Sequence, residues 1–340
     1  MRRITIIGAG LFGLACAHAC ARRGLAVRVI EARRIGAGAS GGQVGALAPH
    51  DPAQWNDKKQ IQLEALVAAG DYWAEVRAIG GVDSGWARLG RFSSPHGDVA
   101  ARLAGATRHW PAGFSMQLRR AEHPLLAGGD HLFDTLTARI SPRGAGAALA
   151  AAVRAQGGVI EEGAGPRHPD RIDIDGPCIW ATGAEGLEML SVDLGRPVGR
   201  AIKGQSASFR LSLPQAPQLF LEGLHVVPHA DGTVAIGSTA ERDFADPAAT
   251  DAQLEALIER ARTLCPPLAA APLAERWAGL RPRAQSRAPL LGPWPGRDGH
   301  WVANGGFKIG LAMAPWAGEA LADWLLDGHC RVPEGWRLTG

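Results

Sequence analysis

Glycines and one glutamate near the N-terminus have the spacing of a dinucleotide-binding turn. The stretch Gly8-Ala9-Gly10-Leu11-Phe12-Gly13 has glycine at its first, third and sixth positions, and Glu31 follows 23 residues after the first of them. The first glycine permits a tight turn, the second lets the backbone approach a pyrophosphate, and the third lets a helix pack closely on a strand. A carboxylate at this distance accepts hydrogen bonds from a ribose. These residues predict binding of the adenosine and pyrophosphate of a dinucleotide.

The flanking sequence predicts the elements that this chemistry requires. The β-branched run at 4–7 predicts a buried strand, residues 11–23 a helix, and residues 25–30 a second strand. A helix that begins at the glycine turn directs free N–H groups and its positive dipole end towards a phosphate. The segment 36–43 is nearly free of bulky side chains, so its backbone can pass close to a large ligand. Within it, Ser40 can offer a hydroxyl group to a phosphate.

The composition limits the classes of protein that are possible. A chain of 340 residues is too long for one hydrophobic core, so we expect two domains. Its 36 Lys and Arg against 33 Asp and Glu give a charge of +3 without a basic stripe, so no nucleic-acid partner is expected. The five scattered cysteines contain no CxxC motif, which argues against disulfides and structural zinc and favours the cytoplasm. No apolar run approaches ~18 residues, so no membrane span is predicted.

The remaining chain alternates between helical and strand patterns. Helices are predicted over 141–153, 251–264 and 314–326, and strands over 159–160 and 179–183. Residues 224–227 and 233–236 predict a hairpin, with Asp231-Gly232 as its turn. The proline at 228 prevents His225 and His229 from forming a helical metal-binding pair, so no metal site is predicted.

Several later motifs resemble those of the D-amino-acid oxidase superfamily of FAD-dependent oxidoreductases, and they occur in the same order along the chain as in that family. The similarity favours the branch that includes glycine oxidase and sarcosine oxidase, and only residues 51–139 match weakly. Besides the N-terminal glycine turn, the matching motifs are Ala39-Ser40-Gly41, Trp180-Ala181-Thr182-Gly183, Lys203-Gly204-Gln205, the hairpin from Val226 to Gly237, Gly279-Leu280-Arg281-Pro282 and Gly306-Phe307-Lys308-Ile309-Gly310.

The resemblance implies a fold of α/β and α+β parts. A Rossmann-like FAD-binding domain would comprise residues 1–50, 140–198 and 277–340, and a mainly antiparallel-sheet substrate domain residues 51–139 and 199–276. Sarcosine-oxidase relatives attach flavin through a cysteine soon after the Arg281 region. None lies between Cys265 and Cys330 here, so FAD should bind noncovalently. The residues expected to contact FAD are Gly8, Ala9, Gly10, Leu11, Phe12, Gly13, Glu31, Ala32, Arg33, Ser40, Gly41, Gln43, Gly45, Val159, Ala181, Thr182, Gly183, Gly279, Gly305, Gly306, Phe307, Lys308 and Ile309.

The resemblance also implies a reaction and three catalytic residues. A hydride would pass from the carbon next to nitrogen to flavin N5, with a small amino acid or N-alkyl amino acid as substrate and oxygen or another electron acceptor. Arg281 would bind the substrate carboxylate in a bidentate fork. Lys308 would be a second cation, at a position where glycine-oxidase relatives tend to have arginine and sarcosine-oxidase relatives lysine. His225 takes the place of a tyrosine that is frequent in relatives.

Four alternatives remain open at this stage. A dehydrogenase on the same fold would pass its electrons to a quinone. The segment 38–47 also resembles the flavin domain of an enzyme that modifies the wobble uridine of tRNA. A regulatory or structural nucleotide-binding protein would need no carboxylate-binding residue. An NAD-dependent dehydrogenase would explain residues 1–31 but not 279–310.

Overall fold

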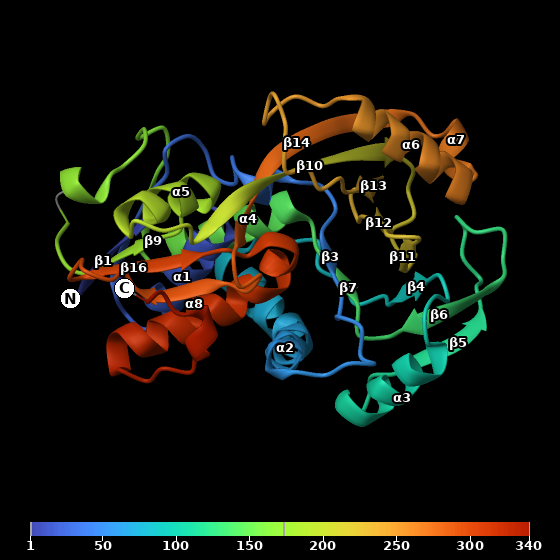
Figure 1. Ribbon diagram of the computed structural model, residues 1–340, viewed down its shortest axis with the longest axis horizontal. Coiled ribbons are helices and arrows are strands. Elements are labelled where there is room, and N and C mark those ends of the chain that lie inside the picture. The colour runs from blue at the N-terminus through green and yellow to red at the C-terminus, as the bar shows by residue number, and fades with distance from the viewer. Residues whose placement is uncertain (1, 173, 340) are drawn as a thin grey trace.

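Two large sheets organise the chain in the computed structural model, which describes residues 2–172 and 174–339 (Figure 1). The first has six strands in the order β15-β16-β9-β1-β2-β8. All its neighbours are parallel except the edge pair β15 and β16. The bounds are β1 Arg3–Ile7, β2 Ala26–Ile30, β8 Val159–Glu161, β9 Cys178–Trp180, β15 Leu290–Pro293 and β16 His300–Asn304.

Helices cover both faces of this sheet. Because successive side chains of a strand point to opposite faces, Ile4 and Ile6 join one core and Ile7 joins another. The core of Ile4 and Ile6 includes α1 (Leu11–Arg22), α4 (Pro142–Ala155) and α8 (Gly310–Asp327), with α2 (Asp57–Gly80) packed on α4 and α8. The core of Ile7 includes α5 (Gly183–Asp193). Both chain ends lie beside this sheet (Figure 1).

The second sheet has eight strands in the order β14-β10-β13-β12-β11-β4-β6-β5. Its neighbours are antiparallel except β11 and β4. The helix α6 (Ala252–Leu264) packs on β10 and β13, and its Leu254 and Ile258 share one buried core with Val226 and Ile236 of this sheet. The bounds are β4 Arg91–Ser93, β5 Met116–Arg120, β6 Asp130–Asp134, β10 Gly199–Arg210, β11 Gln218–Leu221, β12 Leu224–Pro228, β13 Thr233–Gly237 and β14 Leu273–Ala284.

Shorter elements complete the chain. The strands β3 (Ala46–Leu47) and β7 (Ala138–Arg139) pair with each other, α3 (Val99–His109) contacts β5, and α7 (Pro267–Ala270) follows α6. Single 3-10 turns occur at η1 (Ala39–Gly41), η2 (Pro169–Arg171), η3 (Phe307–Ile309) and η4 (Glu334–Trp336). Among the described residues, no helix has both the length and the apolar character needed to cross a bilayer.

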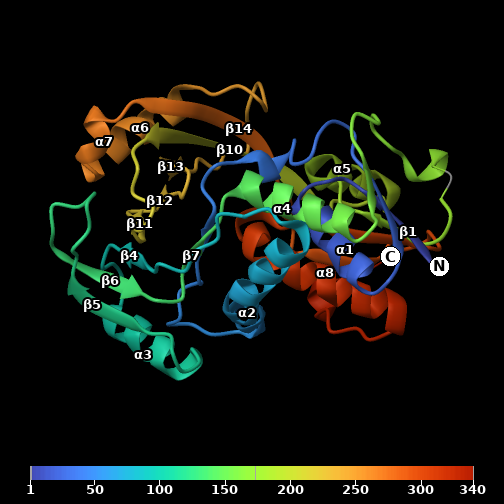
Figure 2. The ribbon, with the colours of Figure 1, turned by 180° about the vertical axis from the view of Figure 1, so that it is seen from behind.

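The predicted fold class is confirmed, and the hairpin at 224–236 forms as β12 and β13. Seen from behind, the long strands β10 and β14 run between the two halves of the molecule (Figure 2). Both strands also contact α5, which covers the first sheet. The predicted domain boundary at 277 falls within β14, because that strand extends from Leu273 to Ala284. The division into two domains stays a prediction.

Candidate active site

A cavity of about 880 Å³ lies between the two sheets and is lined by residues from both. Its volume is within the range of about 300–1,000 Å³ that is usual for ligand and cofactor sites. One end is lined by the glycine turn, Glu31 and the loop 165–167. The other end is lined by Arg281, Lys308 and His225, which come from segments far apart in the sequence.

The glycine turn presents bare backbone to the first end of the cavity. Gly8 has φ of 102°, and a Cβ there would lie 2.5 Å from the carbonyl oxygen of Ala181. A Cβ at Gly13 would lie 2.0 Å from the carbonyl oxygen of Gly8, so only glycine lets α1 pack this closely on the turn. The helix starts without a side-chain cap, and the Leu11 N–H donates to Ser40 Oγ at 3.0 Å. This arrangement fits a pyrophosphate at the helix N-terminus.

Glu31 lies where an adenosine ribose would be recognised. Its buried carboxylate accepts hydrogen bonds from the N–H groups of Ala9 at 2.7 Å and Arg33 at 2.9 Å. A carboxylate has about four acceptor positions, so these two bonds leave capacity for ribose hydroxyl groups. The lining loop 165–167 adds a further wall beside it. The residues at this end of the cavity therefore fit the adenosine half of FAD.

Most residues that the sequence associates with FAD or catalysis line this cavity, and five do not. Ala9 acts through its N–H group, and Gly13 packs against the turn. Val159 is 55% exposed on the edge strand β8. Gly41 and Ile309 also lie outside the lining. Contact with FAD stays a prediction for every residue of the set, whether or not it lines the cavity.

Several lining residues have no recognisable signal in the sequence. They come from loops and strands that only the tertiary fold brings to the cavity. They include Gly165, Pro166, Arg167, Met189, Ser206, Phe220, Ser238, Pro247, Ala248 and Trp277.

Arg281 is a half-buried cation with unused hydrogen-bonding capacity. Its Nη2 donates to the Thr239 carbonyl oxygen at 2.6 Å, and its Nη1 donates to Ser238 Oγ at 3.0 Å. Its Nε is buried and has no partner among the described residues. Burial lowers the pKa of the guanidinium, and the charge of Glu241 partly opposes that shift. Among the described residues no carboxylate oxygen lies within 4.0 Å of the guanidinium, so a carboxylate in the cavity would supply the missing charge.

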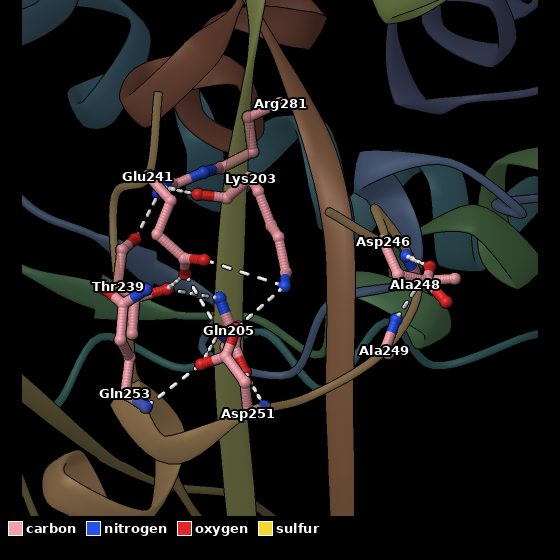
Figure 3. Close-up of polar contacts among 10 residues, drawn as sticks. All are labelled: Lys203, Gln205, Thr239, Glu241, Asp246, Ala248, Ala249, Asp251, Gln253 and Arg281. Carbon is pink, nitrogen blue, oxygen red and sulfur yellow. Dashed lines mark hydrogen bonds and ion pairs between the residues drawn. The ribbon is translucent and has the colours of Figure 1, made fainter. Parts of the chain in front are cut away.

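A polar network around the buried side chains of Lys203, Gln205 and Glu241 fixes the segment that receives Arg281 (Figure 3). Lys203 Nζ lies 3.1 Å from Asp251 Oδ2 and 3.6 Å from Glu241 Oε2. Gln205 Nε2 donates to Glu241 at 2.9 Å and to Asp251 at 2.8 Å. The Gln205 N–H donates to Thr239 Oγ1 at 2.9 Å, and that hydroxyl donates to Glu241. The network therefore holds the stretch 239–241, whose carbonyl oxygen at 239 orients the guanidinium.

This network and the guanidinium lie on opposite faces of β10. Gly204 lines the cavity, and a Cβ there would lie 2.7 Å from Arg281 Nε, so the glycine leaves room for the guanidinium. Lys203 and Gln205 alternate with Gly204 along the strand and point to the other face. The acidic groups of the network are therefore separated by the sheet from the cavity that Arg281 faces.

His225 is a neutral side chain in the same end of the cavity. Its ring packs on Phe220 with a centroid distance of 4.6 Å, and its Nδ1 is buried without a partner among the described residues. Burial, together with the charges of Arg91 and Lys308, lowers the pKa of His225 to about 3. A neutral imidazole has one donor and one acceptor nitrogen, so His225 can make a hydrogen bond into the cavity without adding charge.

Lys308 adds a second cation. Its side chain is exposed, and its Nζ lies 5.9 Å from the centre of the Phe307 ring. In the described part of the chain, the only carboxylates that line the cavity are Glu31 and Glu185. Glu185 lies 3.7 Å from Arg33, which also lines the adenosine end. The end that contains Arg281 and Lys308 is therefore suited to an anionic ligand.

Comparison of the sequence with known protein families identifies the class to which this chain belongs. The family model of FAD-dependent oxidoreductases (DAO) matches residues 3–324, so the chain belongs to that family. It is an FAD-dependent oxidoreductase, and FAD is its cofactor. That the FAD is bound noncovalently stays a prediction.

Among particular relatives, the chain is similar to glycine oxidases. It is 37% identical to the glycine oxidase of Pseudomonas aeruginosa over 153 residues, which are 44% of this chain and 42% of that protein. It is 26% identical to the glycine oxidase of Geobacillus kaustophilus over 94% of this chain and 92% of that protein. The crystal structure of glycine oxidase from Geobacillus kaustophilus has the same fold, with a TM-score of 0.84, 21% identity and coverage of 100% and 99%. The match to the Pseudomonas relative thus spans less than half of its length.

Proposed function

We propose that this enzyme oxidises the C–N bond of a small amino acid or N-alkyl amino acid. A hydride leaves the carbon next to nitrogen, a proton leaves the nitrogen, and the resulting imine is hydrolysed to an oxo acid and ammonia or an amine. Bound FAD supplies the two-electron acceptor, and oxygen or another acceptor reoxidises it. The observation that carries this proposal is Arg281, a half-buried cation that lines the cavity and has no carboxylate oxygen within 4.0 Å among the described residues.

Each residue at this end has a distinct role in the proposal. Arg281 binds the substrate carboxylate and fixes the direction of the substrate, because its planar fork matches both carboxylate oxygens. Lys308 adds positive charge, and neutral His225 makes a hydrogen bond to the carboxylate or the amine. No strong side-chain base is required, since the protein's contribution is orientation. At the other end, the turn at Gly8 and the carboxylate of Glu31 would hold the pyrophosphate and ribose of FAD.

The relatives support the same reaction class, since the curated proteins to which the chain is similar are named glycine oxidases. Glycine itself, sarcosine, proline and other small amino acids are all compatible with the proposal. A reducing, cytoplasmic location stays a prediction, which rests on the scattered cysteines of the sequence and the lack of a CxxC motif.

The test is the visible spectrum of the FAD-loaded protein without oxygen, before and after addition of an amine pool. The pool contains glycine, sarcosine, proline and small D- and L-amino acids. We expect the oxidised flavin bands to bleach, and division of the pool then identifies the substrate. A flavin that stays oxidised with every member would refute the small-amino-acid proposal. Rapid return of the bands in air would favour an oxidase, whereas return only with a quinone would favour a dehydrogenase.

A further inference from the structure

Five cations beside the Arg281 end of the cavity have no acidic partner. They are Lys58, Arg200, Arg242, Arg283 and Arg287, and we call them the cationic cluster. Among the described residues, none of them lies within 4.0 Å of a carboxylate oxygen, although 21 such pairs occur elsewhere. Asp57 and Asp243 adjoin Lys58 and Arg242 in the sequence, so the group keeps an excess of three positive charges (5 − 2), as many as the whole chain carries in balance.

Contacts around Phe307 connect the cluster to the cavity. The Arg283 guanidinium lies 5.8 Å from the centre of the Phe307 ring, and that of Arg281 lies 5.2 Å from it. Arg200 is directly opposite Arg283 in the pairing of β10 and β14. Strand alternation places these arginines on the face of the sheet that also presents Gly204 to the cavity.

The remaining members approach from two other segments. Arg242 follows Glu241, which is bridged to β10. Lys58, on α2, donates a hydrogen bond to the carbonyl oxygen of Arg287, in the turn after β14. The charges of these groups act on one another: burial and then Arg287, Arg242 and Arg200 lower the pKa of Arg283. The positive potential therefore extends from α2 across the end of β14.

A cleft bordered by charges of one sign concentrates ligands of the opposite sign and raises their association rates. A neutral zwitterion such as glycine gains little from that field, because its charges cancel. A ligand with a net negative charge gains in proportion to its charge. We propose that the cationic cluster draws net-anionic substrates into the Arg281 end, so that the enzyme prefers amino or N-alkylamino dicarboxylates to neutral amino acids. This inference rests on the proposed function, and it assigns the second carboxylate to the side of Lys308 and the cluster.

The decisive test compares two acids that carry no amine. Acetate and malonate differ in charge, and their association with the FAD-loaded enzyme can be followed by stopped-flow from the change in flavin absorbance. We expect the double variant Arg242→Gln/Arg287→Gln to slow association by about 3-fold for acetate and about 7-fold for malonate. These values follow from two charges at distances on the order of 10 Å at about 10 mM ionic strength. The difference should vanish at about 0.5 M salt.

Two variants act as matched controls. Arg242→Lys/Arg287→Lys keeps both charges and should behave as the parent enzyme. Arg108→Gln removes an exposed arginine from the last turn of α3 and should also have no effect. Flavin content and thermal unfolding establish that each variant is folded. The proposal is overturned if the double Gln variant slows malonate no more than acetate, if Arg108→Gln has the same effect, or if malonate binds the parent no faster than acetate.

A second measurement uses amines with different net charges. If the inference holds, kcat/KM for aspartate should exceed that for alanine of the same configuration, and only the aspartate value should fall in the double Gln variant. Equal falls for both amines would contradict it. Failure of every amine to reduce the flavin would refute the proposed function. The association of malonate would still decide whether the cluster attracts anions.

Discussion

Replacement of Arg281 by glutamine should separate ligand binding from folding. In the free protein the guanidinium donates hydrogen bonds to Thr239 at 2.6 Å, to Ser238 at 3.0 Å and, more weakly, to the Lys203 carbonyl oxygen at 3.4 Å, and its buried Nε has no partner among the described residues. Burial disfavours its charge, as the lowered pKa shows. The variant loses these hydrogen bonds, of which the third is long and weak, but it is also relieved of a half-buried cation. Since a single hydrogen bond contributes only about 1 kcal/mol net, we expect the free energy of unfolding to change by no more than about 2 kcal/mol.

Carboxylate binding should change much more. Truncation of one partner of a buried, hydrogen-bonded charge pair costs about 2–5 kcal/mol. At about 1.4 kcal/mol per factor of ten, the dissociation constant of acetate should rise by about 30-fold to several thousand-fold. Arg281→Lys should lie between the parent and Arg281→Gln, because lysine keeps the charge but not the planar fork.

The assay is a titration of the FAD-loaded protein with acetate, followed by flavin absorbance, together with a denaturant unfolding curve. Arg276→Gln is the matched control, because Arg276 lies on the same strand and forms an exposed ion pair with Glu255. It should leave the acetate affinity unchanged. An acetate dissociation constant for Arg281→Gln within about threefold of the parent value, with FAD bound, would refute the assignment of Arg281 to the carboxylate.

Other predictions concern the neutral histidine, the glycine turn and the buried network. His225 has its pKa lowered to about 3, so from pH 6.5 downwards the unfolded state binds more protons and stability falls; His225→Asn should make that fall shallower, whereas parallel unfolding curves would contradict it. Gly13→Ala should yield protein without flavin absorbance, because its Cβ meets backbone at 2.0 Å, whereas Gly335→Ala, with open space around it, should keep the flavin. Lys203→Met should lower the free energy of unfolding, measured with denaturant, by about 3–5 kcal/mol, because it leaves the buried Glu241 carboxylate without its cation. The double variant Lys203→Met/Glu241→Gln should recover part of that free energy, and no recovery would argue against this ion pair.

The part of the site that depends on local sequence could be predicted from the sequence. The glycine turn requires a strand, a positive φ and a helix start within a few residues, so its spacing alone specifies its geometry. Glu31 is likewise placed by the end of a neighbouring parallel strand, β2. The hairpin β12–β13 follows from two β-branched runs and an Asp-Gly turn.

Other elements depend on tertiary contacts that the sequence does not display. The 24-residue helix α2 was not predicted, although Asn56 caps its start and Gly81, with φ of 72°, ends it. Its stability comes from packing on α4 and α8. The strand β14 contains Gly279 and Pro282, which argue against a strand interior. Proline is tolerated there because β14 is at the edge of its sheet.

The charges explain why Arg281 remains available to a ligand. Glu241 is the acidic group whose charge acts on Arg281, but it lies on the other face of β10. There it is engaged by Lys203, Gln205 and Thr239. The network thus stabilises the strand that positions the guanidinium without neutralising it inside the cavity. A buried cation that lacks a counter-ion gains most from the first carboxylate that reaches it. The affinity of this end of the cavity for carboxylates therefore depends on keeping the protein's own acids behind the sheet.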